Sequence, residues 1–160
     1  MQARLSLTVQ YAVAADDLPR WRLRRWAAAA ANAAWAAGPP YPFAALELTL
    51  RLVDAGEGKL LNAQFRKRDY ATNVLTFEYG ADPAGTARGD IILCVPVLRR
   101  EAAEQCKPLL AHAAHLTVHG VLHALGYDHI DPDEATEMEA LETRILHNMG
   151  IADPYRIPDA

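Results

Sequence analysis

Eleven residues near the end of the chain, HGVLHALGYDH at positions 119–129, constrain the fold more than any other stretch. His119 and His123 are four residues apart, so in an α-helix they lie on the same face, one turn apart. Gly126 stands where a residue of left-handed conformation commonly ends a helix and reverses the chain. The sequence therefore predicts a helix that ends near Leu125, with His129 returning toward the two helical histidines.

A third helical histidine, His115, lies one turn before this pair, but it cannot share a metal ion with His123. Eight residues of helix span roughly 12 Å, whereas zinc holds its nitrogen ligands at ~2.0–2.1 Å. We therefore predict one Zn²⁺ per chain, bound by His119, His123 and His129, with His115 lining the cleft or supporting a ligand. Three protein ligands and an open fourth position are typical of a catalytic zinc.

The residue after the first predicted ligand is Gly120, where zinc peptidases of the H-E-x-x-H type carry their catalytic glutamate. Without that glutamate, peptide hydrolysis lacks its proton carrier. A zinc ion with an open position still favours hydrolysis, and Arg66 is a candidate for binding two phosphate oxygens at once. These residue types favour a phosphodiester substrate, although the spacing alone does not place Arg66 near the histidines.

Hydrophobic patterning predicts a single α+β domain over residues 1–160. Leu46, Leu48, Leu50 and Leu52 alternate with polar residues, which is typical of a strand with one buried face. Strands are predicted at 4–13, 46–52, 72–79 and 90–97, the last two as a hairpin or looped pair, with a turn at 54–58. Helices are predicted from the Pro19 turn to 37, and at 60–68, 97–106, 108–125 and 132–149, with Asp16 or Asp17 capping the first and Asp131 the last. The expected architecture is a mixed sheet of about four strands packed with helices.

Composition limits the possible partners and environment. The chain has 51% hydrophobic and 22% charged residues and a net charge of -4, so it does not bind nucleic acid through bulk basicity. Basic residues instead form two local clusters, one at Arg22, Arg24 and Arg25 and the other at 66–68. The two cysteines lack metal-ligand or redox spacing, and the alanine-rich run at 27–37 is shorter than the ~20 residues that cross a bilayer. We expect a cytoplasmic protein without a membrane segment.

Four segments together resemble one known family. HGVLHALGYDH, with LNAQFRKRDYATNVLTF and GDIILC upstream and EMEALE downstream, closely resembles the YbeY family of endoribonucleases over about residues 57–150. The resemblance implies a metal-dependent, single-strand-specific endoribonuclease that acts in ribosomal RNA maturation, including the 3′ end of the small-subunit RNA, and in ribosome quality control. It supports His119, His123 and His129 as zinc ligands, and it implies Arg66 and His115 as the catalytic residues. Glu78 departs from the family pattern, in which proline is common.

The resemblance also implies partners. These are single-stranded ribosomal RNA and the small ribosomal subunit with its proteins, and we expect no DNA substrate. Lys67, Arg68 and Tyr70 are candidates for contacting unstacked bases. Two alternatives stay open: a non-catalytic ribosome assembly factor in which zinc only stabilises the turn around Gly126, and a zinc peptidase that takes its carboxylate from elsewhere, such as the last helix.

Overall fold

Four strands form one mixed sheet in the order β1-β2-β4-β3, in a computed structural model that describes residues 4–38, 43–68, 70–127 and 131–155. The strands are β1 (Arg4–Tyr11), β2 (Ala45–Val53), β3 (Val74–Ala81) and β4 (Thr86–Cys94). The helices are α1 (Arg20–Ala37), α2 (Ala55–Arg66), α3 (Val95–Glu104), α4 (Leu109–Ala124) and α5 (Pro132–Asn148). The α+β class and the four-stranded mixed sheet are confirmed.

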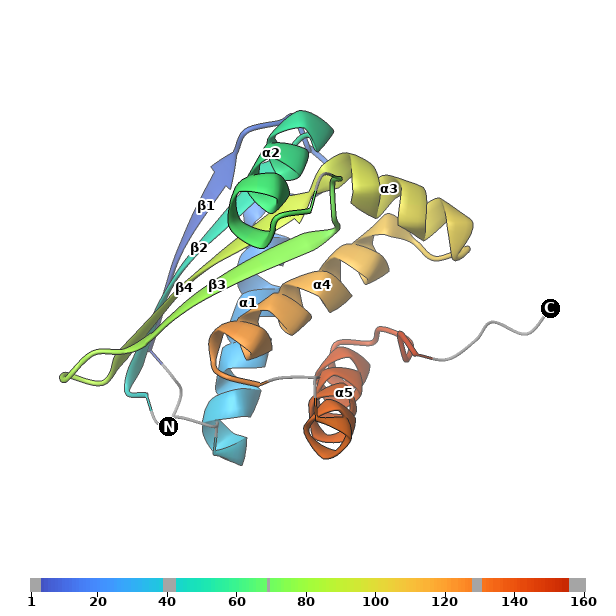
Figure 1. The fold of residues 1–160 in the computed structure, drawn as a ribbon. Helices are drawn as coiled ribbons and strands as arrows, with labels where there is room; N and C mark the ends of the chain where they lie inside the picture. Colours follow the sequence, from blue (N-terminus) through green and yellow to red (C-terminus); the bar gives the residue numbers. More distant parts are fainter. Residues whose placement is uncertain (1–3, 39–42, 69, 128–130, 156–160) are drawn as a thin grey trace.

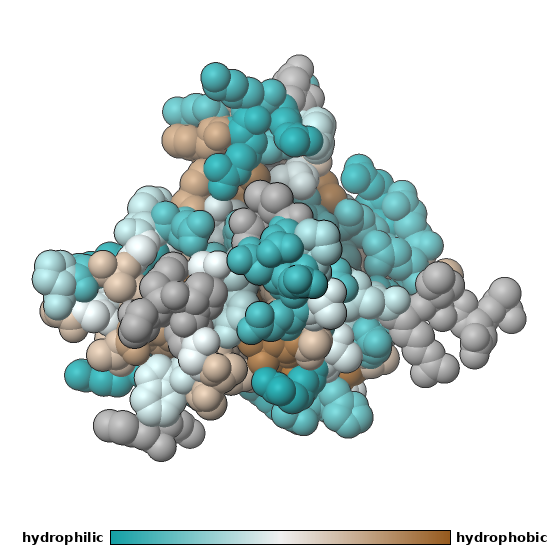
Figure 2. Space-filling model, turned by 60° about the horizontal axis from the view of Figure 1, so that its bottom comes forward, coloured by the Kyte–Doolittle hydropathy of each residue, from teal (hydrophilic) through white to brown (hydrophobic). Residues whose placement is uncertain are grey.

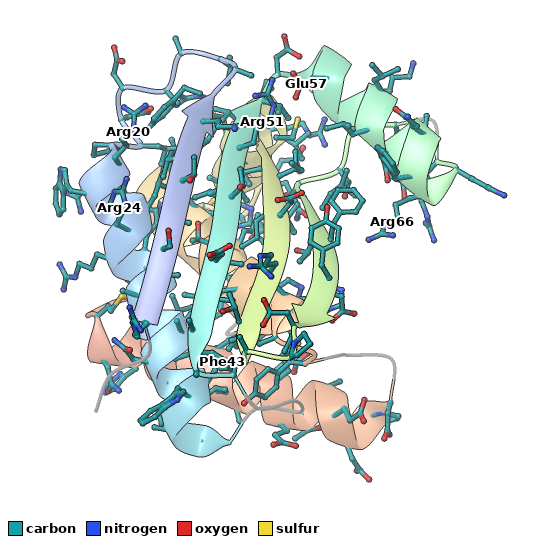
Figure 3. The ribbon with its side chains drawn as sticks, turned by 90° about the vertical axis from the view of Figure 1, so that its left-hand side faces the viewer. Arg20, Arg24, Phe43, Arg51, Glu57 and Arg66 are labelled. Carbon is teal, nitrogen blue, oxygen red and sulfur yellow. The ribbon has the colours of Figure 1, made fainter. Side chains whose placement is uncertain are left out.

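α1, α4 and α5 gather on one face of the sheet, whereas α2 packs against the end of the other face, where Leu61 joins a smaller cluster with Val53, Ile92 and Cys94. β1, β2 and β4 run parallel, and β3 pairs antiparallel with β4, which confirms the predicted hairpin. Figure 1 shows α1 and α4 side by side against this sheet, with α5 beyond them, and the contacts between α4 and both α1 and α5 agree. The opposite face of the sheet is turned toward the viewer in Figure 3. The sheet and α4 thus form the frame on which the candidate site is built.

Small residues allow the helices to approach closely. The predicted strand face is confirmed, because Leu46, Leu48, Leu50 and Leu52 are all buried. On α1 the buried positions include Ala27, Ala30, Ala31 and Ala34, all at 1% exposure or less. A methyl side chain adds little thickness, so these alanines let α1 pack directly against α4. The alanine-rich run is therefore a buried helix face.

Two helices begin at residues that differ from the prediction. α2 starts at Ala55 because Asp54 caps it, its carboxylate accepting a hydrogen bond of 2.8 Å from the Glu57 amide. The predicted turn at 54–58 was therefore wrong, since those residues form the first turn of the helix. The strand predicted to reach Val97 ends at Cys94, since Pro96 lies in the first turn of α3.

The predicted cap of the first helix was also wrong. The N-cap residue of α1 is Pro19, whose backbone is extended and which makes no side-chain cap. Asp17 instead accepts two hydrogen bonds from the Arg99 guanidinium, at 2.7 and 2.9 Å. At the last helix the prediction is confirmed, because the Asp131 carboxylate accepts a hydrogen bond from the Asp133 amide.

The surface is largely polar. In Figure 2 most of the visible face is coloured as hydrophilic or intermediate, and hydrophobic colour is confined to small areas between polar residues. No helix in the described ranges has both the length and the apolar character that a membrane span requires.

Candidate metal centre

Three histidines form a partly exposed row along α4. The ring centroids of His115 and His119 are 6.3 Å apart, and those of His119 and His123 are also 6.3 Å apart. From 112 to 125 these are the only residues that are not buried. The predicted helical spacing is thus confirmed, and the row is the strip of α4 that other groups can reach.

Gly126 reverses the chain as predicted. Its φ is +94°, in the left-handed region, and its amide donates to the His123 carbonyl at 3.0 Å. The Tyr127 amide donates to the Leu122 carbonyl at 3.1 Å. These two bonds form a Schellman motif, which satisfies carbonyls left without a partner at the end of the helix. His129, the third predicted ligand, lies outside the described residues.

The Nδ1 atoms of both predicted helical ligands are anchored. His119 Nδ1 lies 2.5 Å from Glu142 Oε1, and His123 Nδ1 lies 2.9 Å from the Tyr127 carbonyl oxygen. Because a carboxylate and a carbonyl only accept hydrogen bonds, each Nδ1 carries the proton as donor. That tautomer assigns metal binding to Nε2, and this kind of anchoring is common for metal-binding histidines. Two such imidazoles one turn apart are a donor set that fits zinc.

The described residues do not by themselves contain the predicted three-ligand set. Over the ranges 4–38, 43–68, 70–127 and 131–155, no group of three histidine, cysteine, aspartate or glutamate side chains is arranged to hold a metal ion. The predicted third ligand, His129, is not among these residues.

Glu142 on α5 connects three groups at this site. Its side chain is fully buried and lies 3.3 Å from His115 Nε2 and 2.5 Å from His119 Nδ1. The Tyr155 hydroxyl donates a hydrogen bond to the same carboxylate. Burial alone raises the pKa of Glu142, but hydrogen bonds from His115 and His119 outweigh it and lower that pKa to about 2. A buried carboxylate is therefore held ionised behind the histidine row.

Glu142 was not among the predicted site residues, although the sequence carries a signal for it. α5 buries Met138, Leu141 and Ile145 along one face. Glu142 lies on the same face, four residues after Met138, and a glutamate on a buried face is rare unless it is paired. A charged residue inside an apolar stripe was thus the feature that pointed to a buried partner.

His115 and His112 have different surroundings. His115 is in contact with Glu142 and lies 3.3 Å from the Tyr155 hydroxyl, so the structure links it to the site without making it a neighbour of the His123 ring. His112 is 4% exposed, and its Nε2 lies 2.9 Å from Glu101. His112 is therefore a buried residue paired with Glu101 on α3, and its Nδ1 has no hydrogen-bond partner among the described residues.

Gly120 is explained by packing against the sheet. A Cβ atom at this position would lie 2.8 Å from Cγ2 of Ile91, on β4. Position 120, where zinc peptidases carry their catalytic glutamate, therefore faces the closely packed interface between α4 and β4. Glu142 is the carboxylate that the last helix supplies, but it binds the Nδ1 edge of His119, on the other side of the ring from Nε2. The arrangement favours an orienting role for Glu142 and gives the peptidase alternative no support.

Arg66 is held against the edge strand β3. Its Nη2 donates to the Thr76 carbonyl at 2.8 Å, and its Cζ lies 5.1 Å from the centroid of the Phe77 ring. Figure 3 shows Arg66 at the end of α2 on the β3 side of the sheet. α4 packs against the same strand, β3, so Arg66 and the histidine helix both adjoin this strand. Among the contacts of the described residues, none joins Arg66 directly to His115, His119 or His123.

Aromatic and basic side chains surround Arg66. Phe65 and Tyr70 are each 51% exposed, and Arg68 donates a hydrogen bond of 3.1 Å to the Tyr70 hydroxyl. Lys67 adopts a left-handed conformation at the end of α2 and is also exposed. We name these five residues, 65–68 and 70, the α2 surface.

Comparison with known proteins gives consistent results over nearly the full chain. A family model described as Endoribonuclease YbeY matches residues 13–150. The chain is 67% identical over 155 residues to a protein of Bordetella avium named Endoribonuclease YbeY, covering 97% of this chain and 96% of that protein. A protein of the same name from Aromatoleum aromaticum is 51% identical over 157 residues, covering 96% and 94%.

A solved structure shares the fold. The solution structure of TM1509 from Thermotoga maritima is similar with a TM-score of 0.58 at 20% identity. The similarity covers 94% of this chain and 99% of that chain. At this identity it concerns the arrangement of strands and helices alone.

Proposed function

Because the chain belongs to the YbeY family, we propose that it is a zinc-dependent endoribonuclease that cleaves single-stranded RNA. Relatives 67% and 66% identical carry the name Endoribonuclease YbeY over almost their whole length, which supports an RNA-cleaving hydrolase. The observation that carries the proposal is the pair His119 and His123, each with its Nδ1 anchored by an acceptor.

The zinc ion is assigned to His119, His123 and His129. The donor set consists of imidazoles, which suit zinc, and the tautomers of the first two direct Nε2 toward a ligand. When bound with an open position, zinc activates water and polarises a phosphoryl oxygen. One ion per chain is expected, and Glu142 and the Tyr127 carbonyl keep the two helical rings in place for it.

Arg66 is assigned to the phosphodiester. Its planar guanidinium can bind two phosphate oxygens and stabilise the negative charge that gathers on them during cleavage. The contact with Thr76 and Phe77 limits the motion of this long side chain, which lowers the entropy lost on binding. The exposed Phe65 and Tyr70 offer rings on which unstacked bases of single-stranded RNA can stack.

His115 is assigned a positioning role. It contacts the Glu142 carboxylate, which in turn orients His119, so His115 acts on the site through another residue. A buried carboxylate bound by two imidazoles and a tyrosine hydroxyl has well-defined geometry. His115→Ala should therefore lower the affinity for zinc, while the pH dependence of the cleavage rate changes little.

The setting we propose is ribosomal RNA maturation in the cytoplasm, including the 3′ end of the small-subunit RNA, together with ribosome quality control. The partners are then the small ribosomal subunit and its proteins, with neither DNA nor a membrane involved. The net charge of -4 supports a role for such partners, because the chain as a whole does not attract RNA.

The test compares Arg66→Glu and His123→Ala with the wild type on a single-stranded ribosomal RNA fragment, with zinc content measured for each. Arg66→Glu should stay folded and zinc-loaded yet cleave ~10²–10³-fold more slowly, the usual loss for a group that stabilises transition-state charge. His123→Ala should lose zinc and activity together. Arg100→Glu, on α3, is the control for charge and should cleave normally. Equal cleavage by all four proteins would indicate a contaminating nuclease and would refute the proposal.

A further inference from the structure

The first turns of α1 carry an unusual concentration of positive charge. Arg20, Arg22, Arg24 and Arg25 fall within six residues, together with Trp21, and the first turn contains no acidic residue. We name these five residues the α1 face. Trp21 is 56% exposed, and all four arginines are at least partly exposed. The sequence had marked part of this cluster, and the proposed cleavage site does not use it.

The placement of these arginines works against helix stability. The amino-terminal end of a helix carries partial positive charge, so each basic residue there is unfavourable by a few tenths of a kcal/mol or more. Two carboxylates precede the helix: Asp17 is engaged with Arg99, and Asp16 is exposed and lines the same hollow as Arg20. Across the described ranges, no ion pair joins any of the four arginines to a carboxylate. The α1 face therefore carries an excess of positive charge over negative charge within this part of the chain.

The side chains are held in place by contacts other than ion pairs. The Arg22 Cζ lies 4.4 Å from the centroid of the Trp21 ring, and the Arg20 Cζ lies 4.8 Å from that of Tyr11. Arg24 Nη1 donates to the Leu7 carbonyl at 3.0 Å. Guanidinium groups that rest on rings or on the backbone keep further N–H donors available for an anionic ligand.

The α1 face lies at the opposite edge of the sheet from Arg66. Arg24 is bonded to β1 and Arg66 to β3, the two edge strands of the order β1-β2-β4-β3. Three inter-strand spacings of ~4.8 Å place the backbones of β1 and β3 about 14 Å apart. The side chains and helices at the two edges lie beyond this distance. Figure 3 shows Arg20 and Arg24 beside β1 and Arg66 beyond β3. A ligand that reaches both regions must be long.

We propose that the α1 face binds a second stretch of the RNA substrate, away from the position of cleavage. The guanidinium groups would bind phosphates, and the exposed Trp21 ring would stack with an unpaired base. Basic side chains interleaved with an exposed aromatic ring are the combination by which single-stranded nucleic acid is bound without sequence preference. This inference rests on the proposed endoribonuclease function and adds to it a means of holding long RNA.

The test uses the double variant Arg22→Glu/Arg25→Glu with two RNA probes. One is a long single-stranded fragment of ribosomal RNA, and the other is an oligonucleotide of about six nucleotides, which one binding surface can cover. Loss of two phosphate contacts should lower the slope of log K against log salt concentration by about 1.4 for the long RNA. Cleavage of the short RNA should be unchanged, while the KM for the long RNA rises.

Trp21→Ala tests stacking separately from charge. Loss of one stacked base should weaken binding of the long RNA by roughly 5- to 150-fold, the equivalent of 1–3 kcal/mol. Quenching of tryptophan fluorescence by RNA should also decrease, because of the other two tryptophans Trp26 is only 4% exposed and Trp35 is partly buried.

The control is Arg100→Glu/Arg144→Glu, which makes the same change of net charge on α3 and α5. If the affinity for long RNA falls equally in both double variants, the change of net charge explains the loss and the proposal is refuted. It is also refuted if the α1 variant keeps full RNA affinity and instead loses binding to vesicles of anionic phospholipid. Binding is measured without cleavage, so inactivity of the wild type on either RNA would refute the proposed function without deciding this inference.

Discussion

At the scale of single residues, the site depends on which nitrogen of each imidazole carries a proton. Glu142 and the Tyr127 carbonyl each accept from an Nδ1 atom, so His119 and His123 present the same tautomer although their partners come from different segments. Glu142 is 23 residues from His119 in the sequence, but on α5 it is buried directly behind the His119 ring. The orientation of the two proposed helical ligands is therefore determined by partners outside the proposed ligand set.

Substitution of Glu142 tests this dependence. Glu142→Gln keeps the size of the side chain but replaces a charged acceptor, so its hydrogen bonds to His115 and His119 weaken. We expect zinc affinity to fall by about 10- to 100-fold, as is usual when a partner of a metal-binding histidine is removed. The measurement is a titration of the purified protein against a zinc chelator of known affinity.

Glu139→Gln, at an exposed position on the same helix, is the matched control and should bind zinc as the wild type does. Circular dichroism should show that both variants are folded. A folded Glu142→Gln protein with unchanged zinc affinity would contradict the orienting role of this carboxylate.

At the scale of elements, local signals predicted most of the fold. Leucine alternation predicted β2, and the histidine spacing with Gly126 predicted α4 and its reversal. The errors arose where one residue type supports two structures. The turn predicted at 54–58 contains Gly56 and Gly58, yet both lie in α2. The glycine at position 58 is explained by packing, because a Cβ there would lie 3.1 Å from the Cys94 Sγ atom. Contacts between distant segments, such as Glu142 with His119 or Arg66 with β3, left no periodic pattern from which to derive them.

The packing of α4 on β4 makes a prediction about Gly120. An alanine normally favours a helix over glycine by ~1 kcal/mol, but its Cβ would lie 2.8 Å from Ile91 Cγ2. Overpacking of a core typically costs ~1–3 kcal/mol, which exceeds the gain in helix propensity. Gly120→Ala should therefore lower the free energy of unfolding, measured by urea denaturation.

Combining Gly120→Ala with Ile91→Leu removes the methyl group that the new Cβ meets, and should restore part of the lost stability. Gly120→Glu should be far more damaging, since it would bury a carboxylate at the same interface. If Gly120→Ala instead stabilised the protein, close packing against Ile91 would not explain the glycine.

At the scale of the whole molecule, the hydrophobic core and the candidate metal centre are separate. The core joins the sheet to α1, α4 and α5 through buried aliphatic side chains, whereas His115, His119 and His123 lie on the partly exposed strip of α4. The end of α4 is closed by its own backbone hydrogen bonds at Gly126. The described fold is therefore stabilised by groups that do not bind metal.

Removal of zinc tests this separation and the alternative in which the metal only stabilises the turn. The chelator-treated protein should remain folded, with a cooperative thermal transition. Added zinc at about 100 times its Kd should stabilise the native state by ~2.7 kcal/mol, which for a domain of this size corresponds to a rise in Tm of roughly 5–11 °C. His123→Ala should unfold near the Tm of the zinc-free wild type and show little response to zinc. Unfolding of the wild type on chelation, or of His119→Ala even without a chelator, would instead support a structural role for the metal.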